Sequence, residues 1–215
     1  MKILFATLFL LFMINANTQS HNKNTVSVNL GFDGAAHGTV AEVYYNGTLV
    51  DQDTSAAATT LFRFDAHYNI LPWLSAGILY RKGKYIEDPD NAEENGNKVS
   101  DFSFGIRAYG VNKDKFALYA GLYYGFSNLE INRLYSGIPA QYKWKGNNFS
   151  ADLGFNWYFA KMVGMNFSLG YSGHNFDLQE YSINNTPQNL TGWTHTFDTK
   201  GAHVVLGVCF KFLGE

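Results

Sequence analysis

Apolar and polar side chains alternate one by one along most of the chain. Residues 149–159 are the clearest case, with aromatic or aliphatic side chains at odd positions and small or polar ones at even positions. A period of two puts these two kinds of side chain on opposite faces of a β-strand. Beyond residue 20, the sequence has no apolar stripe with helical spacing over three turns or more. The pattern therefore predicts an all-β protein.

Eight segments share this alternation. They cover residues 25–33, 59–70, 73–84, 99–111, 116–129, 149–159, 165–172 and a C-terminal run that ends at Phe212. Their connections alternate between short ones, at 71–72, 112–115 and 160–164, and long ones, at 34–58, 86–98, 130–148 and 173–200. Within the first long connection, residues 39–45 are expected to extend a strand. Short turns at one end and long loops at the other are typical of an antiparallel up-and-down transmembrane β-barrel, here with eight strands.

Alternation alone does not decide which face points inward. In a soluble, lipocalin-like binder the apolar face lines the interior, whereas in a membrane barrel it meets lipid. Glycines recur on the polar face, where a crowded interior needs small residues: Gly31, Gly77, Gly105, Gly121, Gly154, Gly170 and Gly207. Aromatic side chains recur on the apolar face beside the short turns, as in an interfacial girdle: Tyr68, Trp73, Phe116, Trp157, Phe159, Phe210 and Phe212. Both sets favour the membrane barrel.

The N-terminus predicts export. Lys2 precedes a mostly apolar run over residues 3–14, which is shorter than the roughly 20 residues that a membrane-spanning helix needs. A basic residue, a short apolar core and small or polar residues after it are typical of a signal peptide. We expect residues 1–20 to be removed by cleavage after Ser20, or alternatively after Ala16. The barrel domain is then residues 21–215.

Composition narrows the classes of function. Aromatic residues make up 17% of the 215 residues and charged residues only 16%, and the formal net charge is −2. No strongly basic field points to a nucleic acid. The single cysteine, Cys209, excludes an internal disulfide.

The end of the chain carries a family resemblance. Gly207, Phe210 and Phe212 close an alternating run almost at the C-terminus, although Val205 stands where a polar residue is usual and residues 213–215 trail behind. With the eight-strand pattern, this ending resembles the small outer-membrane barrels of the OmpA, OmpX and OmpW type. The resemblance implies a Gram-negative outer membrane, surroundings of lipid and lipopolysaccharide, and insertion by the barrel-assembly machinery. It also implies that Gly207, Phe210 and Phe212 act as the assembly signal.

Charged residues fall on the face assigned to the lumen. They are Asp33, Arg63, Asp65, Arg81, Asp101, Arg107, Asp152 and Lys211, four of each sign. An eight-stranded barrel is just wide enough for side chains to fill it, and buried ions are tolerated when they are paired. We expect a paired polar plug in a structural or surface-interaction protein. A narrow porin or a transporter for small or hydrophobic solutes is the alternative.

Catalytic and metal-binding patterns are weak. Ser172, His174 and Asp177 offer the residue types of a lipid A-modifying hydrolase, but in an order that does not match the His-then-Ser motif of such enzymes. The acidic residues 87–94 lack the glycine and Asx spacing of a calcium loop. We expect no enzyme, no cofactor and no metal site. Aromatic and basic residues in the long loops, such as Tyr142 and Trp144, suit contacts with lipopolysaccharide, a glycan or a partner protein.

Overall fold

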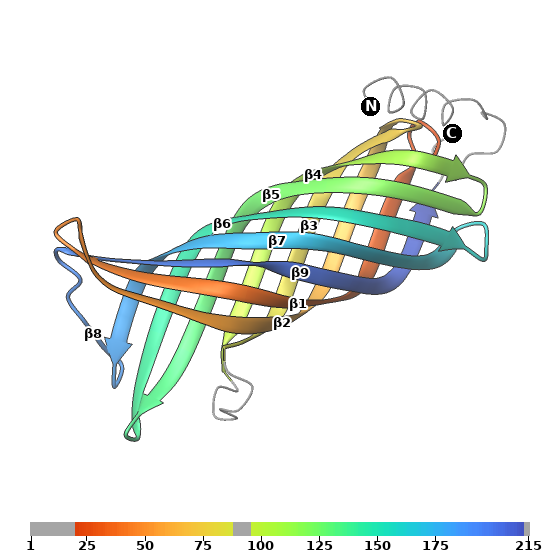
Figure 1. Cartoon of the computed structure of the whole chain (residues 1–215). Helices are drawn as coiled ribbons and strands as arrows, with labels where there is room; N and C mark the ends of the chain where they lie inside the picture. Colours follow the sequence, from red (N-terminus) through yellow and green to blue (C-terminus); the bar gives the residue numbers. More distant parts are fainter. Residues whose placement is uncertain (1–19, 88–95, 213–215) are drawn as a thin grey trace.

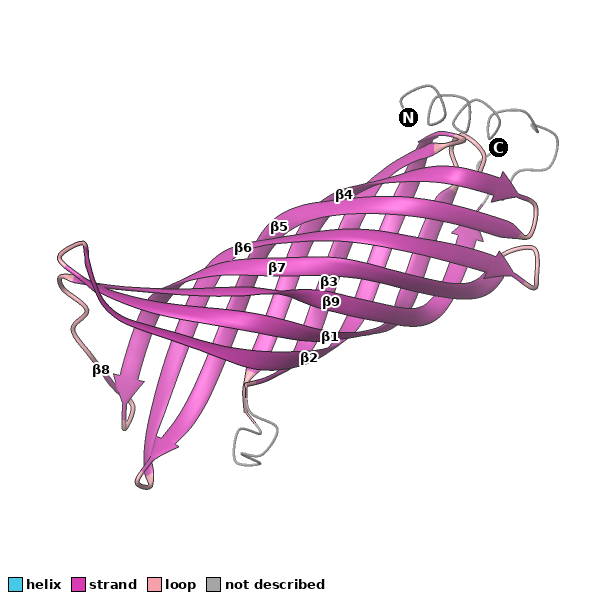
Figure 2. Cartoon of the chain, viewed as in Figure 1, coloured by secondary structure: helices cyan, strands magenta, loops and turns pink. Residues whose placement is uncertain are grey.

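The computed structural model describes residues 20–87 and 96–212. It is a closed antiparallel barrel (Figures 1 and 2). Its strands are β1 (Val26–Tyr45), β2 (Thr48–Leu71), β3 (Leu74–Ile86), β4 (Lys98–Lys113), β5 (Phe116–Tyr135), β6 (Ile138–Tyr158), β7 (Val163–Ile183), β8 (Thr186–Pro187) and β9 (Trp193–Phe212). The predicted signal peptide, apart from Ser20, lies outside the described residues, as do the acidic residues 88–95 and the trailing residues 213–215.

Eight strands form the wall, because the two-residue β8 pairs only with the end of β7. Each of the eight is antiparallel to both neighbours, and β9 pairs with β1 and with β7. Following the paired residues once around the ring from Gly31 leads back to β1 at Ala41, ten residues further on. A stagger of this size tilts the strands by about 40°. The fold class predicted from the alternation is confirmed.

The long connections lie at one end of the barrel, but most of their length is β-structure. Strands β1, β2, β5, β6, β7 and β9 run well past the predicted strand ends, and the extension expected at residues 39–45 is confirmed. Figure 1 shows these extensions as paired ribbons that project beyond the rest of the wall. The predicted strands were therefore too short at this end.

Two-residue turns close three of these extensions. Asn46 and Gly47 have φ of 49° and 81°, Ser136 and Gly137 have 52° and 84°, and Asn184 and Asn185 have 49° and 60°. Two successive positive φ values define the type I′ turn, which matches the twist of the flanking strands. An Asn-Gly pair is the strongest short-range hairpin signal, so residues 46–47 could have shown from sequence that β1 turns directly into β2.

The apolar face points outward over most of the barrel. Leu153 is 69% exposed, Phe32 67%, Phe126 62% and Phe104 60%, whereas Leu79 and Ala117 on the other face are fully buried. The predicted girdle beside the short turns is also exposed at Trp157 and Phe159. No helix in the described part of the chain is long and apolar enough to span a membrane. An outward apolar belt with a polar interior is the arrangement of a transmembrane barrel.

Polarity inverts where the strands leave this belt. On β5, the outward side chains change from Phe126 to Asn128 and Glu130, while the inward ones change from Ser127 to Leu129 and Ile131. The inward residues of this upper part form one apolar cluster: Ala57, Leu61, Tyr85, Val99, Leu129, Ile131, Trp144, Phe176 and Phe197, with Ala41, Tyr142 and Leu178 packed against it. We call this set the apolar cluster. Every one of the eight wall strands contributes to it.

Candidate functional site: the charged lumen

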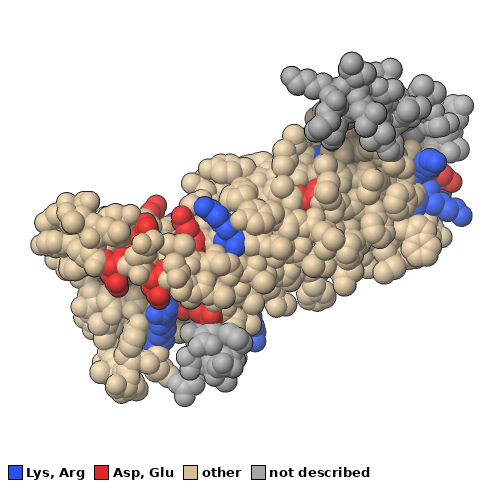
Figure 3. All heavy atoms as spheres, viewed as in Figure 1, with Lys and Arg blue, Asp and Glu red and all other residues tan. Residues whose placement is uncertain are grey.

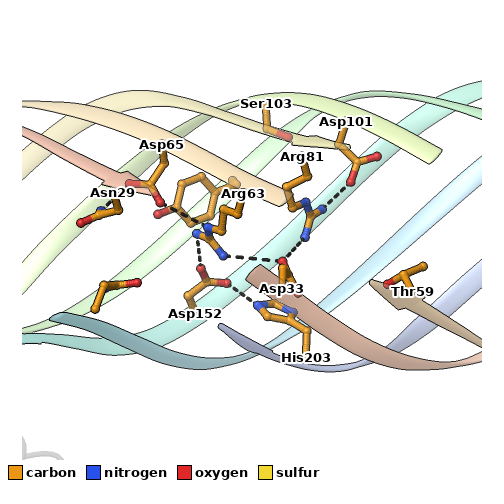
Figure 4. A network of polar contacts seen from close by, with 12 residues as sticks. Asn29, Asp33, Thr59, Arg63, Asp65, Arg81, Asp101, Ser103, Asp152 and His203 are labelled. Atoms are coloured by element: carbon orange, nitrogen blue, oxygen red, sulfur yellow. Dashed lines mark hydrogen bonds and ion pairs between the residues drawn. The ribbon is translucent and has the colours of Figure 1, made fainter. Parts of the chain in front are cut away.

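A network of ion pairs fills the lumen at the level of the apolar belt. Arg63, on β2, is its centre: Nη2 lies 2.8 Å from Asp152 Oδ2, Nε lies 3.2 Å from Asp65 Oδ2, and Nη1 lies 3.8 Å from Asp33 Oδ2. Figure 4 shows that these three carboxylates converge on one guanidinium from three different strands. Their positions in the alternation of β1, β2 and β6 point these carboxylates inward, away from the surrounding hydrocarbon. Arg63 compensates their buried charge there.

Two further arginines extend the network along the barrel. Arg81 Nη1 lies 3.3 Å from Asp33 Oδ2, and its Nη2 lies 2.9 Å from Asp101 Oδ2. Arg107 Nη2 lies 2.9 Å from Asp65 Oδ2, and its Nε donates a hydrogen bond of 2.6 Å to the Tyr123 hydroxyl. The side chains of these arginines and aspartates are at most 2% exposed. Three arginines and four aspartates therefore form one continuous chain, which we call the ion-pair network.

Two histidines that were not assigned to the lumen charges from the sequence complete the network. His203 Nε2 lies 2.9 Å from Asp152 Oδ1, and His174 Nε2 lies 3.3 Å from Asp101 Oδ2. Ser127 also donates a hydrogen bond to Asp101. His203 and His174 occupy inward positions of β9 and β7. The alternation that assigned the aspartates to the lumen could have found these histidines too. With these histidines and the Ser127 and Tyr123 hydroxyls of β5, all eight wall strands contribute side chains to the network or its partners.

Lys211 does not join the other seven predicted residues. Its Nζ donates to the Asp114 carbonyl at 3.3 Å and lies 4.3 Å from the centre of the Tyr158 ring, near the short turns. His21 stacks on Tyr109 there, with ring centres 4.5 Å apart. The four charges of each sign therefore do not all meet in one network. Lys211 is a separate cation at the end of the barrel.

The residues of the hydrolase alternative are spread over different environments. Ser172 is buried in the lumen, whereas Asp177 is exposed on the outer face. His174 is held by Asp101 and by Thr199, whose Oγ1 lies 2.9 Å from Nδ1. Its two ring nitrogens thus have partners other than Ser172. Among the described residues, no group of three or more His, Cys, Asp or Glu could hold a metal ion.

The residues of the proposed assembly signal lie at the closing seam. Gly207 faces Gly31 across the β1–β9 pair, and a Cβ atom added to Gly207 would lie 2.3 Å from the Leu30 carbonyl oxygen. The close approach of the two strands therefore requires glycine at this position whatever its role in assembly. Phe212 is 47% exposed and pairs with Val26 at the short-turn end.

The upper hairpins carry a second group of aromatic residues. Tyr142 stacks on Tyr181 with ring centres 4.6 Å apart, and Arg133 forms an ion pair with Glu87. Burial lowers the pKa of Arg133, but the adjacent Glu87 carboxylate outweighs it and leaves this pKa above its usual value. Trp144, expected as an exposed contact residue, is only 8% exposed because it packs in the apolar cluster.

Comparison with known proteins supports the fold alone. No protein-family model and no curated protein matches the sequence. The solved structure of the outer membrane protein OprG from Pseudomonas aeruginosa is similar, with a TM-score of 0.64 and 14% identity over 92% of this chain and 100% of that chain. The outer membrane protease OmpT from Escherichia coli has a TM-score of 0.47 and 11% identity over 92% of this chain and 100% of that chain. Neisserial surface protein A has a TM-score of 0.47 and 14% identity over 84% of this chain and 97% of that chain.

The fold and the charged lumen together define a class of protein. The chain is an eight-stranded transmembrane β-barrel with its polar side chains inside and an apolar belt outside. Its fold is that of the small bacterial outer-membrane barrels, and the outer membrane protein OprG is one solved example of the same fold. The resemblance inferred from the alternation and the closing strand is confirmed at this level.

Proposed function

We propose that this chain is an integral outer-membrane protein with a structural or surface-interaction role, and that its own side chains close its lumen. The observation that carries the proposal is the ion-pair network at the level of the belt, which lies on five of the eight wall strands and is bonded by side chains of the other three. An ion that crossed the lumen would have to separate pairs such as Arg63–Asp152, at 2.8 Å. Separation is costly because each partner is buried away from water.

The apolar cluster supports the same proposal from above. Phe197 contacts Trp144, Tyr85 and Phe176, with ring centres 5.7, 6.1 and 6.3 Å apart. Water and ions avoid a packed apolar section. A solute entering from the hairpin end would therefore meet two different obstacles in series, first the apolar cluster and then the ion-pair network.

The route to the membrane and the partners belong to the same proposal. Residues 1–20 act as the signal peptide, and Gly207, Phe210 and Phe212 are read by the barrel-assembly machinery. The belt is surrounded by outer-membrane lipid and lipopolysaccharide. Extracellular protein or glycan partners would bind the hairpin tips, where Tyr45 and Trp193 pack together at 4.8 Å and remain nearly half exposed. The chain has no catalytic role in this account.

Two measurements test this proposal, one on the outer-membrane fraction and one on the purified protein. A heat-modifiability gel of the outer-membrane fraction should show a folded species whose mobility changes on boiling. In planar bilayers the folded protein should give no conductance steps, with an open porin inserted in parallel as the positive control. A species insensitive to boiling, or one found only in the periplasm, would overturn the membrane assignment. Stable conductance steps would instead favour the narrow porin.

The remaining alternatives have tests of their own. Uptake of a hydrophobic solute into vesicles that hold the folded barrel, and not into empty vesicles, would support a transporter. A change in the mass of lipid A that disappears with Ser172→Ala would support the hydrolase. We expect neither effect.

A further inference from the structure

A cavity of about 250 Å³ lies among the upper ends of β5, β6 and β7. In register, Asn132 on β5 faces Gln141 on β6, and Gln141 faces Ser182 on β7. Leu134 and Pro139 face each other one step nearer the hairpin tip. We call this cavity the amide pocket; its lining is Asn132, Arg133, Leu134, Pro139, Ala140, Gln141, Ser182 and Asn185.

The polar row of the amide pocket belongs to the outer face of the sheet. Ile131 is buried in the apolar cluster, and Tyr142 packs against that cluster. Their sequence neighbours Asn132 and Gln141 therefore point to the opposite, outer face. On the face drawn in Figure 3, the middle of the barrel shows little charge, and charged side chains gather toward the hairpin end. The pocket lies at this polar end, where water surrounds the wall.

Charges next to the pocket compensate one another. One step nearer the belt, a row of alternating sign crosses four strands: Lys98 faces Glu130, Glu130 faces Lys143, and Lys143 faces Glu180. Neighbours of opposite charge in such a row stabilise the sheet, and Lys143 Nζ lies 2.6 Å from Glu180 Oε2. Arg133 is held in an ion pair of its own. Among the described residues, the charges around the pocket are therefore balanced, which favours a neutral ligand.

Hydrogen bonds hold the Gln141 side chain in one orientation. Its Nε2 donates to Glu130 Oε1 and to Asn132 Oδ1, both at 3.1 Å. Asn132 Nδ2 donates in turn to the Gly96 carbonyl at 3.2 Å. These bonds use both Nε2 hydrogens and leave Gln141 Oε1 as a fixed acceptor beside the Ser182 hydroxyl, which can donate and accept. A ligand hydroxyl matches both groups, whereas a carboxylate or phosphate would set an acceptor against Oε1.

We propose that the amide pocket binds one neutral sugar ring of an extracellular glycan. Ring hydroxyls bond to Gln141 Oε1 and to the Ser182 hydroxyl, and the apolar face of the ring lies on Leu134 and Pro139. Leu134 is 57% exposed and gains from this apolar contact. Sites for drug-sized ligands measure about 300–1,000 Å³, so the smaller pocket suits a single ring. This inference rests on the proposed surface-interaction role and supplies the chemistry of the partner.

Binding can be measured by saturation-transfer NMR on the folded barrel, in a detergent without a sugar headgroup. The probes are the methyl glycosides of glucose, galactose, mannose and N-acetylglucosamine. The variant Q141A/S182A removes two hydrogen bonds worth about fivefold each, so its affinity for the best-bound glycoside should fall about twenty-five-fold. The matched control Q52A/T54A removes an amide and a hydroxyl from an exposed stretch of β2. Its affinity should stay within about twofold of the wild type.

A further variant and charged probes test the shape and the neutrality of the pocket. Ser182→Trp fills the cavity with an indole and should abolish the transfer signal while the barrel stays heat-modifiable. Glucosamine and glucuronic acid should bind about tenfold more weakly than the neutral glycosides, because a charge without a partner is costly to desolvate.

The outcomes separate this inference from the proposed function. Equal affinity of Q141A/S182A and the wild type, or equal binding of charged and neutral sugars, would overturn the neutral-sugar pocket. A heat-modifiable wild type that binds none of the glycosides also sinks the pocket but leaves the outer-membrane location and the closed lumen standing. A species insensitive to boiling would contradict the proposed function itself.

Discussion

The belt region and the hairpin region of this barrel use the same strands with opposite polarity. At the belt, charged side chains fill the interior and aromatic or aliphatic ones face outward. Toward the hairpin tips, the apolar cluster fills the interior and residues such as Asn128 and Asp177 face outward. The backbone arrangement hardly changes between the two regions. The difference shows that the surrounding solvent, and not the strand geometry, decides which side chains are buried.

The two interiors are held together by different forces. In the belt region, hydrocarbon surrounds the wall, so burying apolar side chains inside would gain little over leaving them in lipid. Ion pairs such as Arg107–Asp65, at 2.9 Å, can therefore form the interior contacts. In the hairpin region, water surrounds the wall and the hydrophobic effect stabilises the cluster as in a soluble protein. His174 joins the two regions, since it contacts Asp101 and stacks on Phe176 at 5.4 Å.

Removing the central arginine should have the largest effect. Arg63→Ala leaves Asp33, Asp65 and Asp152 short of one cation in a buried site, which should cost about 3–5 kcal/mol. Urea unfolding in lipid vesicles, followed by tryptophan fluorescence, measures the loss. The double variant R63L/D152L removes a pair together and should lose less than the single variant. A single-variant loss below about 1 kcal/mol would contradict a network that depends on pairing.

Substitutions to arginine on the outer face should affect stability differently in the two regions. Leu153→Arg, in the apolar belt, should cost about 2–4 kcal/mol because the cation enters hydrocarbon. Asn128→Arg, outward on the neighbouring strand but above the belt, should change the free energy of unfolding by less than about 0.5 kcal/mol. The same urea titration compares them. Equal tolerance at the two positions would mean that lipid does not surround Leu153.

Truncating the apolar cluster should cost less than breaking the network. Leu129→Ala should destabilise the barrel by about 2 kcal/mol, the lower end for a buried leucine, because the cluster lies near the end of the barrel and can relax. Leu134→Ala is the control, since Leu134 is 57% exposed. Amide hydrogen exchange should show the loss in the upper strands. Unchanged exchange there would argue against a packed core in the hairpin region.

The surface ion pair of the hairpin region should have the smallest effect. Arg133→Ala removes the contact with Glu87 and should cost less than about 1 kcal/mol, because water and salt screen an exposed pair. A double-mutant cycle with Glu87→Gln gives the coupling energy of the pair. A coupling as large as that expected for the buried arginine would remove the contrast between the two interiors.

Sequence alternation predicted the belt region well and the hairpin region poorly. From Phe116 to Ser127 on β5, polar or small inward side chains alternate with apolar outward ones. The strand and the orientation of its side chains therefore followed directly from the sequence. Beyond Ser127 the alternation continues but its sense reverses at Leu129, which is where the predicted strand ends. Apart from the extension at residues 39–45, the upper parts of the strands were not predicted, although residues 46–47 carry a turn signal.

The sequence predicted which residues belong to the candidate site better than it predicted which of them are in contact. The period of two placed both Arg63 and Asp152 in the barrel interior, although 89 residues separate them in sequence. It could not show that Lys211 lies apart, because height along the barrel depends on strand stagger. It also did not assign His203 and His174 to the network, although both occupy inward positions; their distances to Asp152 and Asp101 show that they belong to it.

Spin labels at two positions distinguish a belt surrounded by lipid from a hairpin region surrounded by water. Nitroxides are attached at Leu153 and Asn128 in a variant that lacks the buried Cys209, and the barrel is folded into vesicles. We expect the label at position 153 to collide often with oxygen and rarely with a water-soluble nickel chelate, and the label at position 128 to show the reverse. Strong nickel collision at position 153, equal to that at 128, would contradict the account.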